Sequence, residues 1–129
     1  MTPEAAAAAA QMIAEARWTG GPLGPLPEAC YPATVADGYM VQAALHDIMA
    51  KNVMSACAGY KIGCTTEVMQ DYLGIDHPCA GGILGTNIHQ GDTTLAHADY
   101  CKVGAECEID RKLCFDLPAG TNHPVARLA

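Results

Sequence analysis

The order of the periodic patterns along the chain constrains its fold most, because helical patterns come first and strand patterns come later. Residues 3–17 predict a helix, since Thr2 is a capping residue and Pro3 suits a first turn. Gly20 then ends this helix at the start of a Pro/Gly-rich connector. Helices that precede strands, instead of alternating with them, are typical of an α+β fold rather than a doubly wound sheet.

A second helix is expected to begin near Thr34. Thr34 and Asp37 have the spacing of a capping box, with Asp in the place of Glu. Val41 and Leu45 follow on one face at helical spacing. The two patterns together predict an N-terminal helical region over residues 1–54.

The strand patterns lie in the remaining part of the chain. Residues 55–63 (SACAGYKIG) predict a buried strand that ends in glycine, and 101–115 predict a strand most clearly. Between them, 65–73 predict a short helix that Gly74 ends. Residues 75–91 are expected to be mostly loop, with one short apolar piece.

Composition limits what the core contains. The chain of 129 residues is long enough for one domain with a modest core, and only seven of its residues are aromatic. Small and aliphatic side chains must therefore fill that core. The seven cysteines form no C-x-x-C pair and lack zinc-finger spacing. We expect them to be small buried hydrophobes rather than disulfides or ligands of a soft metal.

A net charge of −7 restricts the partners of the chain. Nucleic acids and anionic membranes both require a basic surface, so neither is expected as a partner. No apolar run approaches the ~18 residues that span a bilayer, and the N-terminus lacks the features of a signal peptide. The expected location is the cytoplasm.

The segment 105–110 carries the clearest chemical pattern. In a strand, alternate side chains share a face, so Glu106, Glu108 and Asp110 project together. Carboxylates that converge in this way bind hard cations such as Mg²⁺ or Mn²⁺ and leave positions open for a substrate. The pattern alone is equally typical of a solvated acidic strand face that binds nothing.

Lys61 lies in an apolar strand pattern between Gly59 and Gly63. Burying an ammonium group without a partner is costly, so a lysine in this position indicates a function. It would face an anionic substrate or a developing enolate. The alternative is an ordinary exposed strand lysine, with glycines that only mark the strand ends.

Asp76 and His77 are further candidates for catalysis. Both lie in the loop that follows the predicted short helix. A role in proton transfer competes with turn formation for Asp76 and with a plain surface position for His77.

Four stretches in register carry a family resemblance: GYMVQ at 38–42, GYKIGCTT at 59–66, MQ-x-x-LGID-x-P at 69–78, and AECEI running on to DLP at 105–118. Their order and spacing resemble the 2-keto-4-pentenoate hydratase and 4-oxalocrotonate decarboxylase group of the fumarylacetoacetate hydrolase superfamily. The resemblance covers residues 34–120.

The resemblance implies roles for the candidate residues. Glu106 and Glu108 match the metal carboxylates of the family, for Mg²⁺ or Mn²⁺, and Lys61 matches its active-site lysine. The implied fold is a helical region at 1–54, followed at 55–129 by the first part of a mixed, roll-like β catalytic domain. The resemblance further implies that this domain is truncated, since the third metal carboxylate of the family would be expected beyond residue 129.

The implied activity is a metal-dependent hydratase (a lyase) that adds water to a 2-hydroxydienoate or 2-oxo-enoate during the meta-cleavage catabolism of aromatic compounds. A decarboxylase of the 4-oxalocrotonate type using the same metal site is an alternative. A non-catalytic fragment that needs a partner chain is another. The expected partner is a small anionic 2-oxo acid, and the full-length form is expected to be a homo-oligomer.

Overall fold

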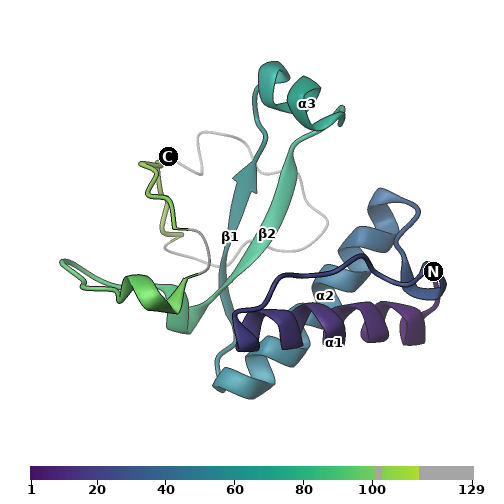
Figure 1. The fold of residues 1–129 in the computed structure, drawn as a ribbon. Coiled ribbons are helices and arrows are strands. Elements are labelled where there is room, and N and C mark those ends of the chain that lie inside the picture. The colour runs from purple at the N-terminus through teal and green to yellow at the C-terminus, as the bar shows by residue number, and fades with distance from the viewer. Residues whose placement is uncertain (101–102, 114–129) are drawn as a thin grey trace.

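The computed structural model describes residues 1–100 and 103–113. Within them, two long helices precede a two-stranded antiparallel sheet, which confirms the predicted α+β class. Figure 1 shows the helical pair at one end of the hairpin and a short helix at the other. The elements are α1 (Pro3–Thr19), α2 (Val35–Val53), β1 (Cys57–Gly63), α3 (Glu67–Leu73) and β2 (Cys79–Leu84), with 3-10 turns at Glu28–Cys30, Gly85–Asn87 and His97–Asp99.

Both long helices begin where the sequence predicts, and α1 also ends at the predicted glycine. The Thr2 hydroxyl accepts a hydrogen bond from the Ala5 amide at 3.2 Å, which caps α1. Gly20 ends α1 in the left-handed conformation, with φ of 64°. At α2, the capping box between Thr34 and Asp37 is present in both directions. Local sequence therefore determines where these helices lie.

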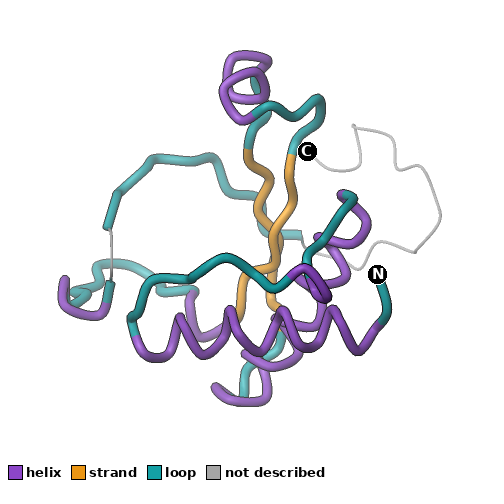
Figure 2. The backbone as a smooth tube through the Cα atoms, turned by 45° about the vertical axis from the view of Figure 1, so that its right-hand side comes forward, coloured by secondary structure: helices purple, strands orange, loops and turns teal. Residues whose placement is uncertain are grey.

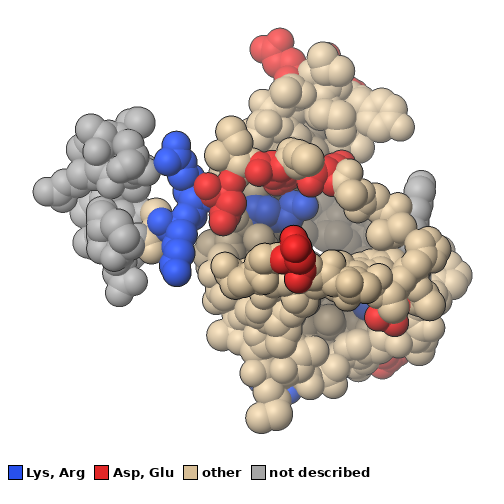
Figure 3. Space-filling model, turned by 90° about the vertical axis from the view of Figure 1, so that its left-hand side faces the viewer, with Lys and Arg blue, Asp and Glu red and all other residues tan. Residues whose placement is uncertain are grey.

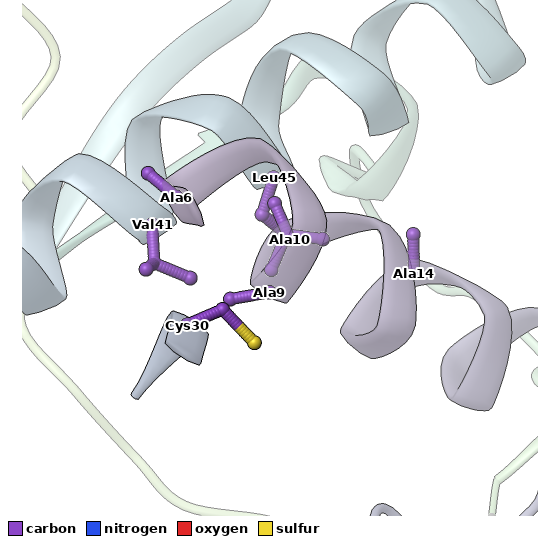
Figure 4. Packing of buried hydrophobic residues seen from close by; sticks show 7 residues of the cluster. All are labelled: Ala6, Ala9, Ala10, Ala14, Cys30, Val41 and Leu45. Carbon is purple, nitrogen blue, oxygen red and sulfur yellow. The ribbon is translucent and has the colours of Figure 1, made fainter. Parts of the chain in front are cut away.

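The hydrophobic core lies between α1 and α2 (Figure 4). The buried residues of α1 are all alanines, and Ile13 of the same helix packs against the core from its edge. This arrangement confirms the prediction of a core built from small and aliphatic side chains. Its buried members are Ala6, Ala9, Ala10, Ala14, Cys30, Val41 and Leu45.

Asp37 joins the start of the chain to the start of α2. Its side chain forms an ion pair with the Met1 amino group and accepts hydrogen bonds from the Ala33 and Thr34 amides at 3.2 and 3.0 Å. The hydrogen bond from the N-terminus, and then the one with Thr34, lower the pKa of Asp37 below 3.8. The stability that this carboxylate contributes is therefore complete above that pH and is lost as the pH falls through the lowered value.

Side chains on the hairpin of β1 and β2 are far more exposed than the sequence predicts. Figure 2 shows the two strands running away from the helical pair toward α3. The strand predicted at 55–63 is confirmed at Cys57–Gly63, but Tyr60 and Ile62 are 80% and 63% exposed, so the prediction that it is buried is wrong. The physical reason is that the described residues provide only one partner strand and that α2 packs along β2 instead of covering β1. The prediction also missed β2 itself, which lies inside the expected loop at 75–91.

The strand predicted at 101–115 is also wrong where it is described, because residues 103–113 form neither helix nor strand. Residues 101–102 and 114–115 lie outside the described residues. An alternating pattern needs a neighbouring strand to satisfy its backbone groups. In residues 1–100 and 103–113 the hairpin supplies no such ladder to this segment. Glu106 and Glu108 consequently lie on a loop.

The free cysteines correct the expectation that cysteine is buried. Cys30 is buried, but Cys57 and Cys107 are exposed, and Cys64 and Cys79 are half-buried. Only the cysteine that lies between the two long helices has a core around it, since the hairpin and the 103–113 segment bury little. In the part of the chain that the structure describes, no helix is long and apolar enough to cross a membrane.

Candidate active site on the hairpin

Strand β1 presents Lys61 beside a glycine on β2. The register pairs Lys61 with Gly81, and a Cβ placed on Gly81 would lie 3.5 Å from the Lys61 Cγ. The aliphatic stem of the lysine therefore runs over the glycine, while the ammonium group stays exposed. Helix α2 holds β2 next to this position, because the Ala80 amide of β2 donates to the Tyr39 hydroxyl at 3.0 Å.

A cavity of about 410 Å³ lies between β1 and the 103–113 segment. It brings together the predicted lysine and one predicted carboxylate from parts of the chain more than 40 residues apart. Figure 3 shows this side of the molecule, where acidic and basic side chains lie next to one another. The lining residues are Tyr60, Lys61, Ile62, Ile83, Glu108, Ile109, Asp110 and Arg111.

The charges around this cavity are balanced. Lys61 and Arg111 are cationic, whereas Glu108 and Asp110 are anionic. Within residues 1–100 and 103–113, none of these four side chains forms an ion pair with another. The cations are thus available to a substrate carboxylate, and the carboxylates are available to a hard cation.

The two predicted metal carboxylates are not equivalent in the structure. Glu108 lines the cavity and Glu106 is not among its lining residues. The wall is formed by the consecutive residues 108–111, which a strand would direct to opposite faces. As a result, the carboxylate that accompanies Glu108 is Asp110, and the joint role of Glu106 and Glu108 stays a prediction.

The donor set fits Mg²⁺ or Mn²⁺ in kind. Proteins often hold Mg²⁺ with one or two carboxylates, and waters or substrate oxygens complete the octahedron. Among the residues that the structure describes, no group of three or more His, Cys, Asp or Glu side chains is arranged to hold a metal ion. The chain therefore offers two carboxylates to a cation at this cavity rather than a complete cage.

Asp76 and His77 lie elsewhere. Both line a hollow of about 560 Å³ around the end of α3, together with Asp71 and Val35. The Pro78 carbonyl oxygen lies 2.9 Å from His77 Nδ1 and accepts a hydrogen bond from this nitrogen. The structure thus separates these two candidates from the cavity that holds Lys61.

Sequence reasoning missed two of the residues that shape the cavity, Tyr60 and Arg111. The alternation with Glu108 already indicates Asp110 as a residue on the same face. Arg111 carried no signal, because it reaches the cavity only through the irregular path of the 103–113 segment. Tyr60 would point away from Lys61 in an ideal strand, yet both line the same hollow.

Comparison with known proteins finds curated relatives of one kind. The chain is 32% identical over 117 residues to the 2-keto-4-pentenoate hydratase of Paraburkholderia xenovorans (strain LB400). It has the same identity, over the same length, to 2-keto-4-pentenoate hydratase 3 of Pseudomonas putida. A 2-keto-4-pentenoate hydratase of Paraburkholderia phymatum is 28% identical over 113 residues. The resemblance to this hydratase group is confirmed.

The extent of these matches is uneven. They cover 91% of this chain in the first two cases and 88% in the third, but the chain spans only 43% of the length of each relative. No protein-family model matches the chain, and no solved structure matches it.

Proposed function

We propose that this chain carries the lysine and carboxylate part of a hydratase site, which adds water to a 2-hydroxydienoate or 2-oxo-enoate in the catabolism of aromatic compounds. The observation that carries the proposal is the cavity that Lys61 and Glu108 share. The similarity to relatives named 2-keto-4-pentenoate hydratase supports it.

In this proposal, the cationic side chains of Lys61 and Arg111 bind the substrate. A 2-oxo acid presents a carboxylate and an adjacent carbonyl oxygen, and Arg111 and Lys61 offer donors to both on the two sides of the cavity. The exposed rings and aliphatic side chains of Tyr60 and Ile62 border the same hollow and suit the apolar tail of the substrate. The two cations and the apolar border support a small anionic 2-oxo acid as the ligand in this proposal.

Lys61 then acts on the charge that develops during the reaction. Ketonisation of the dienol moves a proton from the 2-hydroxyl group to carbon and leaves an alkene conjugated with the new carbonyl group. Water adds to that electron-poor alkene, and negative charge gathers on the 2-oxygen. The Lys61 ammonium group beside that oxygen stabilises the charge and can donate a proton, which the resulting amine can take back.

The carboxylates near the cavity are proposed to bind a metal ion. Glu108 with Asp110, and Glu106 two residues before Glu108, are the groups that would hold Mg²⁺ or Mn²⁺. When bound, such an ion supplies a Lewis acid for the 2-oxo and carboxylate oxygens of the substrate.

The exposed hairpin supports a proposal about the fold. We infer that residues 55–129 form the first part of a mixed, roll-like β domain and that residues 1–54 form a separate helical region. The helical pair has its own buried core, whereas Tyr60 and Ile62 on the hairpin lack cover in the described residues. The full-length form would be a cytoplasmic homo-oligomer.

Turnover of the dienol tests the proposed function. The chain is mixed with 2-hydroxypenta-2,4-dienoate and Mg²⁺, and the loss of the ultraviolet absorption of the conjugated diene is followed. We expect saturable turnover that Lys61→Ala lowers by about 10²-fold or more, the usual cost of removing a proton-transfer or charge-stabilising group.

Lys51→Ala is the matched control, because Lys51 is an exposed lysine in the last turn of α2, away from the cavity. It should leave turnover unchanged. An absence of turnover in the unaltered chain, or equal turnover in Lys61→Ala, contradicts the proposal.

A further inference from the structure

Two cysteines stand at the base of the segment that leaves the hairpin and returns to it. The last register pair of the hairpin is Gly63 with Cys79, and Cys64 follows Gly63 directly. Residues 65–78, which include α3, form the excursion between the two cysteines. The register thus places the two cysteines near each other. Both are half-buried and free, so they remain within reach of small molecules from solvent.

The two thiols interact with each other. Partial burial raises the pKa of the Cys64 thiol, and the charge of the neighbouring Cys79 raises it further. The strand register supplies the geometry, because Cys79 is paired with the residue directly before Cys64. A paired residue and the chain neighbour of its partner have Cα atoms roughly 5–6 Å apart, within the range that a disulfide spans. The proximity of the two cysteines is thus a property of the fold rather than of one exposed cysteine alone.

The backbone holds Cys64 in an uncommon conformation. Its φ is 57°, in the left-handed region that residues other than glycine rarely adopt. The Gln70 side-chain amide donates to the Cys64 carbonyl oxygen at 2.8 Å, which ties α3 to this turn. A conformation of this kind persists only where the surroundings impose it, and such residues gather at functional positions.

We propose that Cys64 and Cys79 form an oxidisable dithiol, which a hydroperoxide converts into a disulfide that closes the 65–78 excursion. One thiolate attacks the peroxide, the O–O bond breaks, and a sulfenic acid and an alcohol (or water) result. The second thiol attacks the sulfenic sulfur, the S–S bond forms, and water leaves. Two thiols lose two electrons in total, and the peroxide gains them.

The disulfide would restrain a part of the molecule that packing holds loosely. Helix α3 contains no buried residue, and among the described residues Gln70 supplies the hydrogen bond from an α3 side chain to the chain outside the helix. A crosslink between Cys64 and Cys79 reduces the freedom of the whole excursion. That excursion includes Asp76 and His77, so oxidation fixes the hollow that these two residues line.

Peptide mapping of the oxidised chain tests the proposal. Cleavage after glutamate separates residues 29–67, which include Cys64, from residues 68–106, which include Cys79. After hydrogen peroxide treatment and blocking of free thiols, we expect these two peptides to remain joined, with the mass of two hydrogens lost, until a reductant is added. The same treatment should slow amide hydrogen exchange in α3.

Single substitutions identify the cysteines. Cys64→Ser and Cys79→Ser should each abolish the joined peptides, whereas Cys57→Ser, which removes an exposed cysteine on β1, should retain them. Separate peptides from the oxidised unaltered chain, or joined peptides that persist in Cys64→Ser, overturn the proposal. Unchanged exchange in α3 after the link has formed overturns the restraint.

Discussion

The helical pair and the hairpin differ in how much of their apolar surface is buried. Between α1 and α2, methyl groups and two aliphatic side chains are buried, both helices are capped, and the chain terminus is tied down by Asp37. On the hairpin, Tyr60 and Ile62 are exposed, and the strands are joined to the helices mainly along β2.

This difference separates stability from chemistry. The free energy of folding in the described residues comes mostly from the helical pair, where apolar area is removed from water. The groups that can act on a substrate lie on the exposed hairpin and on the 103–113 segment. Substitutions in the helical pair should therefore lower mainly the stability, whereas substitutions on the hairpin and the 103–113 segment should weaken mainly the binding of substrate.

Deletion of core volume should show the largest contrast. Leu45→Ala removes a side chain that is only 5% exposed, and we expect the free energy of unfolding to fall by about 2–5 kcal/mol. Ile62→Ala, on the hairpin, should cost under about 0.5 kcal/mol. Urea unfolding followed by circular dichroism measures both, and equal losses would mean that the hairpin shares the core.

The junction of the two regions should be the next most sensitive place. A Cβ on Gly82 would lie 2.7 Å from the His46 ring and 3.0 Å from the Cys57 sulfur, so Gly82→Ala should cost about 1–3 kcal/mol. The matched control is Gly81→Ala, one residue earlier, whose Cβ would make an ordinary contact with Lys61. Similar midpoints for the two variants would rule out the close approach of α2 to β2.

Removal of helix caps should distinguish packed from unpacked helices. Thr34→Ala removes the hydroxyl that accepts from the Asp37 amide at 3.1 Å, and it should lower global stability by about 1 kcal/mol. Thr66 caps α3, which buries nothing, so Thr66→Ala should fray that helix without moving the global midpoint. Amide exchange detects local fraying of α3, and urea titration detects a change in global stability. A shift of the urea midpoint in Thr66→Ala would contradict the claim that α3 contributes no packing to the fold.

The smallest effect is expected at the boundary itself. Met54 ends α2 with φ of 51° and is 93% exposed. Glycine adopts this conformation without the clash of a Cβ, so Met54→Gly should raise stability by up to about 1 kcal/mol. Thermal unfolding of the variant measures the change, and a lower midpoint would show that Met54 makes a stabilising contact.

The sequence predicts the helical region well because its signals are local. Thr2, Gly20, Thr34 and Asp37 form the predicted caps through bonds that span at most a few residues. The spacing of Val41 and Leu45 also correctly identifies the face of α2 that becomes buried. Such features depend little on what the rest of the chain does.

The same reasoning fails where a partner decides the outcome. The apolar pattern around Tyr60 and the alternation around Glu108 match strands with neighbours, but burial and pairing depend on residues far away in sequence. The meeting of Lys61 with Glu108 and Arg111 depends on the path of a segment without regular structure. The residue types predict which chemistry the site can perform. Which of these residues lie together can be known only from the fold.

Magnetic resonance titration tests the central claim, that Lys61 and Glu108 face one substrate cavity. The chain labelled with nitrogen-15 is titrated with 2-oxopentanoate in the presence of Mg²⁺, and backbone amide shifts are followed. We predict saturable shifts at 60–62 and 108–111, with the α1 core unaffected. Shifts confined to the hollow around Asp76 and His77, or no saturable shift, would contradict the account.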